Sequence, residues 1–280
     1  MIASRLHAAS FAITLVGLMA WYGYAAAETA EEPGGSPVTS GAIAIDADKA
    51  IEWRRAERIV IARGNAKASR GDTQVQADVL TAHYRNRPDG TTEVWRIDGD
   101  GGVRITSPSQ TATGERGTYD LDTDTLTLTG GKDLAVTTST SRITADRQID
   151  YLVASKTLVA HGNAVAVDGE RTVYGDVVTI HLADAPKGQS QFQSLDAERN
   201  VRFVTAQDDI RADHGTYDAD SGIAKVNGSV KVVRGSNVLT GCRGEINVKT
   251  GISKLLACDE ARDGGTRVQG VILPQSLRKN

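Results

Sequence analysis

The stretch TYDADSGIAKVNGSVKVV, residues 216–233, holds the pattern that decides the fold. Apolar and polar residues alternate in its second part, as in Val230-Lys231-Val232, and a period of two is typical of a strand with one buried face. The run DADSG precedes that part, and Asp and Gly favour the tight turn of a hairpin. Residues 149–167, IDYLVASKTLVAHGNAVAV, repeat the same order of strand, turn, strand and Gly-containing break. The sequence therefore predicts antiparallel hairpins.

The chain repeats itself at an offset of 98 residues. Residues 64–66 and 162–164 both read GNA, and residues 117–120 and 215–218 both read GTYD. Within each block, a shorter unit begins at an acidic residue that follows Ala or Gly. These acids are Asp48, Asp78, Glu115, Asp146, Asp176 and Asp213, with Cys242 opening a seventh unit.

Repeated hairpins that each cover only their neighbours predict a stacked, elongated architecture. We expect an all-β fold, an elongated, twisted antiparallel β-jellyroll slab of stacked hairpin repeats over residues 42–274. The duplication leaves open whether this is one long slab or two shorter ones that meet near residue 140.

Composition excludes several functions. The formal net charge is −3 and the pI is about 6.0, so the chain lacks the positive charge of a nucleic-acid binder. Aromatic residues make up only 5% of the chain, whereas 29 of its 280 residues are glycine. This balance favours short strands and turns.

The first 27 residues have the layout of a secretory signal peptide. Arg5 precedes an apolar run over residues 11–19, and Ala25-Ala26-Ala27 offers a cleavage site. The alternative is a retained anchor with interfacial aromatics at residues 21, 22 and 24. Residues 28–41, which include EEPGGSP, are expected to form a flexible spacer, and residues 275–280 a C-terminal tail. The product is expected to be exported.

Motifs for catalysis or metal binding are missing from the sequence. His83 and His181 occupy duplicate positions, which favours a structural role. The run Asp218-x-Asp220-x-Gly222 resembles the opening of a calcium loop, but Ser229 stands where that loop needs Glu, so a hairpin turn is favoured. We therefore expect no catalytic residue, no metal site and no cofactor.

The two cysteines of an exported chain are expected to pair. If Lys249 and Ile252 pair across a two-residue turn, Cys242 faces the residue beside Cys258, and a bulge at Gly244 would correct the offset. A Cys242–Cys258 disulfide is predicted. The alternative is two buried free thiols.

Alternating apolar residues could either fill a core or line an open trough for acyl chains. Small aliphatic side chains leave such a trough open, and burying each methylene stabilises a lipid by about 0.8 kcal/mol. Arg104 and Arg202 are candidates for its rim. The lipid-binding candidates are Ile59, Ile61, Val103, Ile105, Val165, Val167, Val201, Phe203, Val230 and Val232.

The sequence resembles the OstA-like, or LptA, family of periplasmic lipopolysaccharide-transport proteins. The resemblance rests on IAIDADKAIEW (residues 43–53), IVIARGNAKASRGDTQVQAD (residues 59–78) and RVQGVILP (residues 267–274). It rests also on three short motifs that recur along the chain, Ala-Asp, Tyr-Asp-x-Asp and Gly-Asn-Ala. This chain differs from a typical member by its greater length and its 98-residue duplication.

The resemblance implies a periplasmic, non-enzymatic β-jellyroll whose hydrophobic groove carries the acyl chains of lipid A from the inner to the outer membrane. It implies as partners an inner-membrane LptC-like and an outer-membrane LptD-like jellyroll, joined through edge strands. The first strand, near residues 42–45, and the last, near residues 267–273, are unblocked apolar edges, so a head-to-tail homo-oligomer is also expected. The alternatives are a structural β-repeat scaffold without lipid cargo and a polysaccharide-active enzyme.

Overall fold

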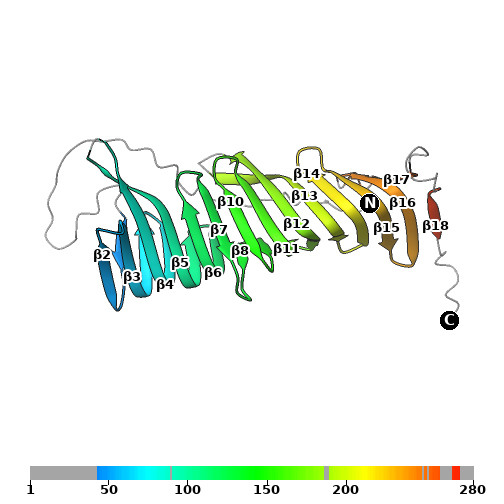
Figure 1. The fold of residues 1–280 in the computed structure, drawn as a ribbon. Helices are drawn as coiled ribbons and strands as arrows, with labels where there is room; N and C mark the ends of the chain where they lie inside the picture. Colours follow the sequence, from blue (N-terminus) through cyan, green and yellow to red (C-terminus); the bar gives the residue numbers. More distant parts are fainter. Residues whose placement is uncertain are drawn as a thin grey trace, which may run out of the picture.

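The computed structural model describes residues 43–88, 90–185, 189–247, 249–250, 252–258 and 267–271. These residues form antiparallel strands and contain no helix, so the predicted all-β jellyroll is confirmed. Figure 1 shows a long, twisted slab that runs from β2 at one end to β17 and β18 at the other. The strands are β1 (Ala44–Asp46), β2 (Ala50–Arg54), β3 (Ile59–Arg70), β4 (Thr73–Asn86), β5 (Thr92–Ser107), β6 (Gln110–Asp120), β7 (Thr125–Thr129), β8 (Ala135–Thr138), β9 (Ser141–Thr144), β10 (Gln148–Leu152), β11 (Thr157–Asp168), β12 (Arg171–Ala185), β13 (Gln189–Val204), β14 (Asp208–Asp218), β15 (Ile223–Arg234), β16 (Asn237–Asn247), β17 (Ile252–Leu256) and β18 (Gln269–Val271).

The predicted signal peptide, spacer and tail (residues 1–27, 28–41 and 275–280) lie outside the described residues. No helix capable of crossing a membrane occurs in the part of the chain that is described.

The slab has two facing walls, because most long strands bend in the middle and contribute one half to each wall. The second half of β3 pairs with β1, whereas its first half pairs with β2. In the same way β6 pairs with β8 through residues 110–113 and with β7 through residues 116–120. Wall A comprises β1, β8, β9, β18 and residues 66–70, 73–77, 103–107, 110–114, 164–168, 171–175, 201–204, 208–212, 230–234 and 237–241. Wall B comprises β2, β7, β10, β17 and residues 59–63, 79–86, 92–100, 116–120, 157–161, 177–185, 189–198, 214–218, 223–227 and 243–247.

The repeated Gly-Asn-Ala motif builds the bends of β3 and β11. At Gly64-Asn65 and Gly162-Asn163 both residues have positive φ, and the register of the sheet shifts there. Glycine and asparagine tolerate this left-handed conformation, so a bulge forms and turns the strand from one wall to the other.

The acids that mark the repeat units lie beside bends of this kind. Asp146 accepts a hydrogen bond of 2.7 Å from Asn163 Nδ2, and Asp176 accepts one of 2.9 Å from Asn200 Nδ2. Asn200 also has positive φ, and lies in the bulge of β13. The acids therefore stabilise the bend of a neighbouring strand.

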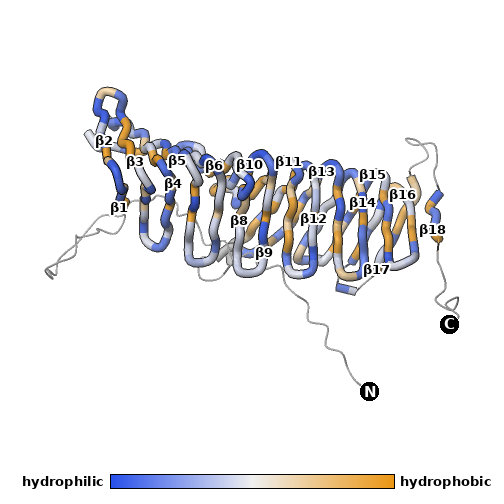
Figure 2. The backbone as a smooth tube through the Cα atoms, turned by 90° about the horizontal axis from the view of Figure 1, so that it is seen from below, coloured by the Kyte–Doolittle hydropathy of each residue, from blue (hydrophilic) through white to orange (hydrophobic). Residues whose placement is uncertain are grey.

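The hydrophobic core lies between the walls. The main cluster combines wall-A residues such as Val103 and Val173 with wall-B residues such as Leu128 and Leu195. A second, smaller cluster of Ile210, Ala212, Val226 and Val230 lies toward β16. Figure 2 shows hydrophobic segments recurring from strand to strand along the slab, with mostly hydrophilic turns at its margins.

Cys242 and Cys258 lie in a disulfide, with 4.9 Å between their Cα atoms. The strand register expected around them is wrong. Asn247, not Lys249, pairs with Ile252, and β16 pairs with β17 from residue 243 to residue 247 without a bulge at Gly244. The pairing ends at Arg243 and Leu256, and Cys242 and Cys258 meet just beyond this last pair.

Candidate functional site

A continuous row of inward-facing residues runs along each wall, linked by direct cross-strand pairing. In wall A, the row connects Val75 through Ile105 and Ala112 to Val136, and continues through Val173, Phe203 and Ile210 to Val232. In wall B, a facing row connects Ile97, Tyr119, Leu126, Tyr151, Leu158, Ile180, Leu195, Tyr217, Ala224 and Ile246. The two rows are the sides of a groove along the slab.

Six of the ten residues predicted to line a groove face inward. They are all in wall A, on β5, β13 and β15: Val103, Ile105, Val201, Phe203, Val230 and Val232. The structure therefore brings this part of the candidate site together on one side of the groove.

The other four candidates are on the opposite face of the sheet, so their inward placement is wrong. Val165 and Val167 alternate with Ala164 and Ala166, and it is the alanines that belong to the core. Likewise Ala62 is in the core cluster, so its strand neighbour Ile61, and Ile59 with it, are on the other face, where Ile61 is nevertheless only 5% exposed.

Arg104 and Arg202 are not at the rim of the groove. Arg202 lies on the outer face, where its guanidinium is 5.7 Å from the centre of the Tyr174 ring and 2.7 Å from an Asp209 oxygen. This hydrogen bond lowers the pKa of the Asp209 carboxyl. Arg104 follows the inward Val103 and therefore also points outward.

The duplicated histidines and the acidic turns have structural partners. His83 Nε2 is 2.9 Å from Asp98, and His181 Nδ1 is 3.3 Å from the Thr157 hydroxyl. Asp218 accepts a hydrogen bond from the Ser221 backbone N–H at 2.8 Å, as expected for a hairpin turn. Among the described residues, no cluster of His, Cys, Asp and Glu could hold a metal ion.

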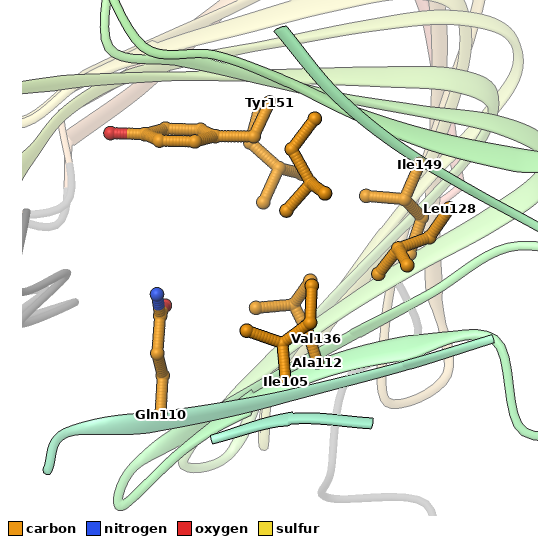
Figure 3. A pocket seen from close by; sticks show the side chains of 9 residues that line it. Ile105, Gln110, Ala112, Leu128, Val136, Ile149 and Tyr151 are labelled. Carbon is orange, nitrogen blue, oxygen red and sulfur yellow. The ribbon is translucent and has the colours of Figure 1, made fainter. Parts of the chain in front are cut away.

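In the first half of the slab, side chains nearly fill the groove. We call the space between Ile105, Ala112 and Val136 of wall A and Leu126, Tyr151 and Leu158 of wall B the first station; its cavity is about 30 Å³. Figure 3 shows Leu128 and Ile149 at one end of this space and the polar ends of Gln110 and Tyr151 facing each other at the other end.

In the second half of the slab the groove opens. We call the cavity of about 350 Å³ between Val173, Phe203 and Ile210 of wall A and Tyr217, Ala224 and Ile246 of wall B the second station. A cavity of this size falls within the usual range of ligand pockets, roughly 300–1,000 Å³.

The second station has charged residues among those that line it, at the hairpin turns of wall A. Arg234 donates hydrogen bonds of 2.7 and 2.9 Å to the Asp208 carboxylate. Arg171 and Glu170 also line the cavity, and within the described residues Arg171 has no ion-pair partner. Burial raises the pKa of the Tyr217 hydroxyl, which stays uncharged at neutral pH. The station is therefore apolar between the walls and charged along one margin.

None of the groove candidates identified from the sequence is an inward-facing residue of wall B. Leu126-Thr127-Leu128 alternates clearly and both leucines line the first station, so a signal was present in the sequence. Ala224 and Ile246 carry no comparable signal, because their place in the groove depends on pairing between β15 and β16.

Gly215 supports the ring of Phe203, and this gives a prediction. A methyl group at Gly215 would lie 2.5 Å from Phe203 Cε2, so Gly215→Ala should push the ring toward the second station. We expect the free energy of unfolding to fall by about 1–3 kcal/mol. Chemical denaturation measures this loss. Gly117→Ala, at the duplicate position, is the matched control, because its methyl group would lie no closer than 3.1 Å to a neighbouring side chain. It should lower the free energy of unfolding by less than Gly215→Ala does. An equal loss at both positions would contradict this placement of Phe203.

Comparison with known proteins gives a family match over most of the chain. The model of the LptA/(LptD N-terminal domain) LPS transport protein family matches twice, over residues 44–151 and 142–252. An uncharacterized protein of Rhizobium meliloti (strain 1021) is 34% identical over 94 residues, which are 32% of this chain and 50% of that protein. The chain thus spans about half the length of this curated relative.

A solved structure also matches. It is LptH of Pseudomonas aeruginosa, described as the LptA homologous periplasmic component of the conserved lipopolysaccharide transport device. The match covers 83% of this chain and 96% of LptH, with 11% sequence identity and a TM-score of 0.22.

Proposed function

The chain belongs to the LptA/LptD N-terminal domain family of lipopolysaccharide transport proteins, and we propose that it shields the acyl chains of lipopolysaccharide in its groove as they cross the periplasm from the inner to the outer membrane. The family is one of transport proteins rather than enzymes. Export to the periplasm through a cleaved signal peptide is part of this proposal.

The observation that carries the proposal is the groove itself. Two apolar rows face each other along the slab and leave a cavity of about 350 Å³ between them at the second station. Exposing an acyl chain to water costs a free energy of about 0.8 kcal/mol for each methylene, so a carrier has to cover the chain on its way through an aqueous space. Apolar walls of this kind provide that cover without any chemical step.

The ends of the slab supply surfaces for the proposed partners. Ile51 and Trp53 on β2 are 53% and 64% exposed, and Ile252 on β17 and Val271 on β18 are 58% and 61% exposed. Unpaired apolar strand edges accept an added strand from another chain. We propose that LptC-like and LptD-like jellyrolls, or further copies of this chain, join these edges head to tail.

The nearly filled first station supports a second candidate, a structural β-repeat scaffold of the cell envelope without lipid cargo. The two functions differ in one property, since only the carrier needs to bind acyl chains.

A displacement titration tests the carrier function. The purified chain is loaded with a fluorescent fatty acid, and lipopolysaccharide is added. We expect lipopolysaccharide to displace the probe because its acyl chains compete for the groove. Deacylated lipopolysaccharide is the control and should leave the probe bound. Failure of the probe to bind, or equal displacement by the deacylated control, would favour the scaffold.

A further inference from the structure

The two stations are the same place in the two copies of the duplicated block. Ile105 and Phe203 are 98 residues apart in the sequence, as are Ala112 and Ile210, and each pair lies in the inward row of wall A. In wall B, Leu126 pairs with Tyr151 as Ala224 pairs with Ile246. The structure therefore contains its own comparison of a closed and an open groove.

Wall B accounts for the difference between them. Along the row that follows the pairing, Leu126, Tyr151 and Leu158 of the first station correspond to Ala224, Ile246 and Ser253 of the second. Each exchange replaces a larger side chain by a smaller one. In wall A the side chains of the second station are the larger ones, since Phe203 replaces Ile105 and Ile210 replaces Ala112. Wall A therefore does not open the cavity.

The size of the second station limits its occupant. A dry cavity of about 150 Å³ holds one benzene ring, so about 350 Å³ offers room for on the order of a dozen carbons, the scale of one acyl chain. At the margin of the same cavity Arg171 lies next to Glu170, and Arg234 is paired with Asp208, so the apolar space ends at charged residues.

We infer that an acyl chain of lipopolysaccharide binds between the walls at the second station, and that Leu126, Tyr151 and Leu158 close the first station against it. This inference rests on the proposed function and makes it more specific: Ala224, Ile246 and Ser253 are the residues that decide where along the slab the cargo is held. The first half of the slab is then a packed support that ends in the N-terminal edge strands.

The inference is tested by photo-crosslinking of purified full-length chain to lipopolysaccharide. A benzophenone amino acid replaces Ile105 in one variant and Phe203 in the other, which are duplicate positions facing the two stations. We expect at least tenfold more lipid adduct at position 203 than at position 105. The double substitution A224L/S253L, made in the Phe203 variant, should reduce that adduct at least tenfold. In the Ile105 variant, L126A/L158S should produce an adduct that the parent lacks.

The outcomes separate this inference from the proposed function. Equal adduct at both positions would overturn the closed first station and leave the carrier function standing. Adduct at neither position would overturn both. Thermal unfolding followed by circular dichroism reports whether the double variants fold, and the comparison of positions 105 and 203 does not depend on them.

Discussion

Replacing Leu128 by alanine is expected to lower the free energy of unfolding by about 3–5 kcal/mol. The side chain is 1% exposed, lies in wall B within the main core cluster, and lines the first station. Its removal would join the space of three lost carbons to an existing cavity of about 30 Å³, and the stiff walls cannot move together to fill it. Equilibrium denaturation with guanidinium chloride measures the loss.

Leu152→Ala is the matched control for this prediction. Leu152 is also in wall B, on β10, but it is 38% exposed, so its truncation should cost less than about 1 kcal/mol. Similar losses at both leucines would mean that the space between the walls is not a close-packed core.

Removing the disulfide with C242S/C258S is expected to cost about 2–5 kcal/mol. The cysteines are 16 residues apart, and closing a loop of that length restricts the unfolded chain by about 3 kcal/mol. Cys242 stands where six other repeat units have an acid, so the disulfide stabilises the last bend of the stack covalently. Hydrogen exchange should locate the effect, with faster exchange in β16 and β17 than in β5 and β6.

The same substitution should also weaken lipid binding, because Ile246 of β16 and Ser253 of β17 line the second station. Reduction of the wild-type chain by dithiothreitol provides an independent route to the same state. Uniformly faster exchange over the whole slab would contradict a local role for the disulfide.

The strands and their stacking could be predicted from the sequence because alternation and turns are local properties. The Gly-Asn-Ala motif marks the repeat in the sequence, and in the structure it forms the bends of β3 and β11 between the walls. The inward face could not be predicted where Ala164-Val165-Ala166-Val167 is apolar throughout, since alternation then leaves both faces open to burial.

The position of the cavity could not be predicted either. Its volume depends on residues such as Phe203 and Ser253, which are far apart in the sequence and meet only across the two walls. The pairing of β16 with β17 shows the same limit, because the length of one loop decides which residues face each other.

Photo-crosslinking in living cells reports whether lipopolysaccharide lies between the walls of the slab. Benzophenone is placed at Phe203, which faces the space between the walls, or at Tyr174, an aromatic residue whose ring lies beside Arg202 on the outer face. If the groove carries the acyl chains, we expect lipopolysaccharide adduct at position 203 and none at position 174. Adduct at position 174 alone, or at both positions equally, would contradict this expectation.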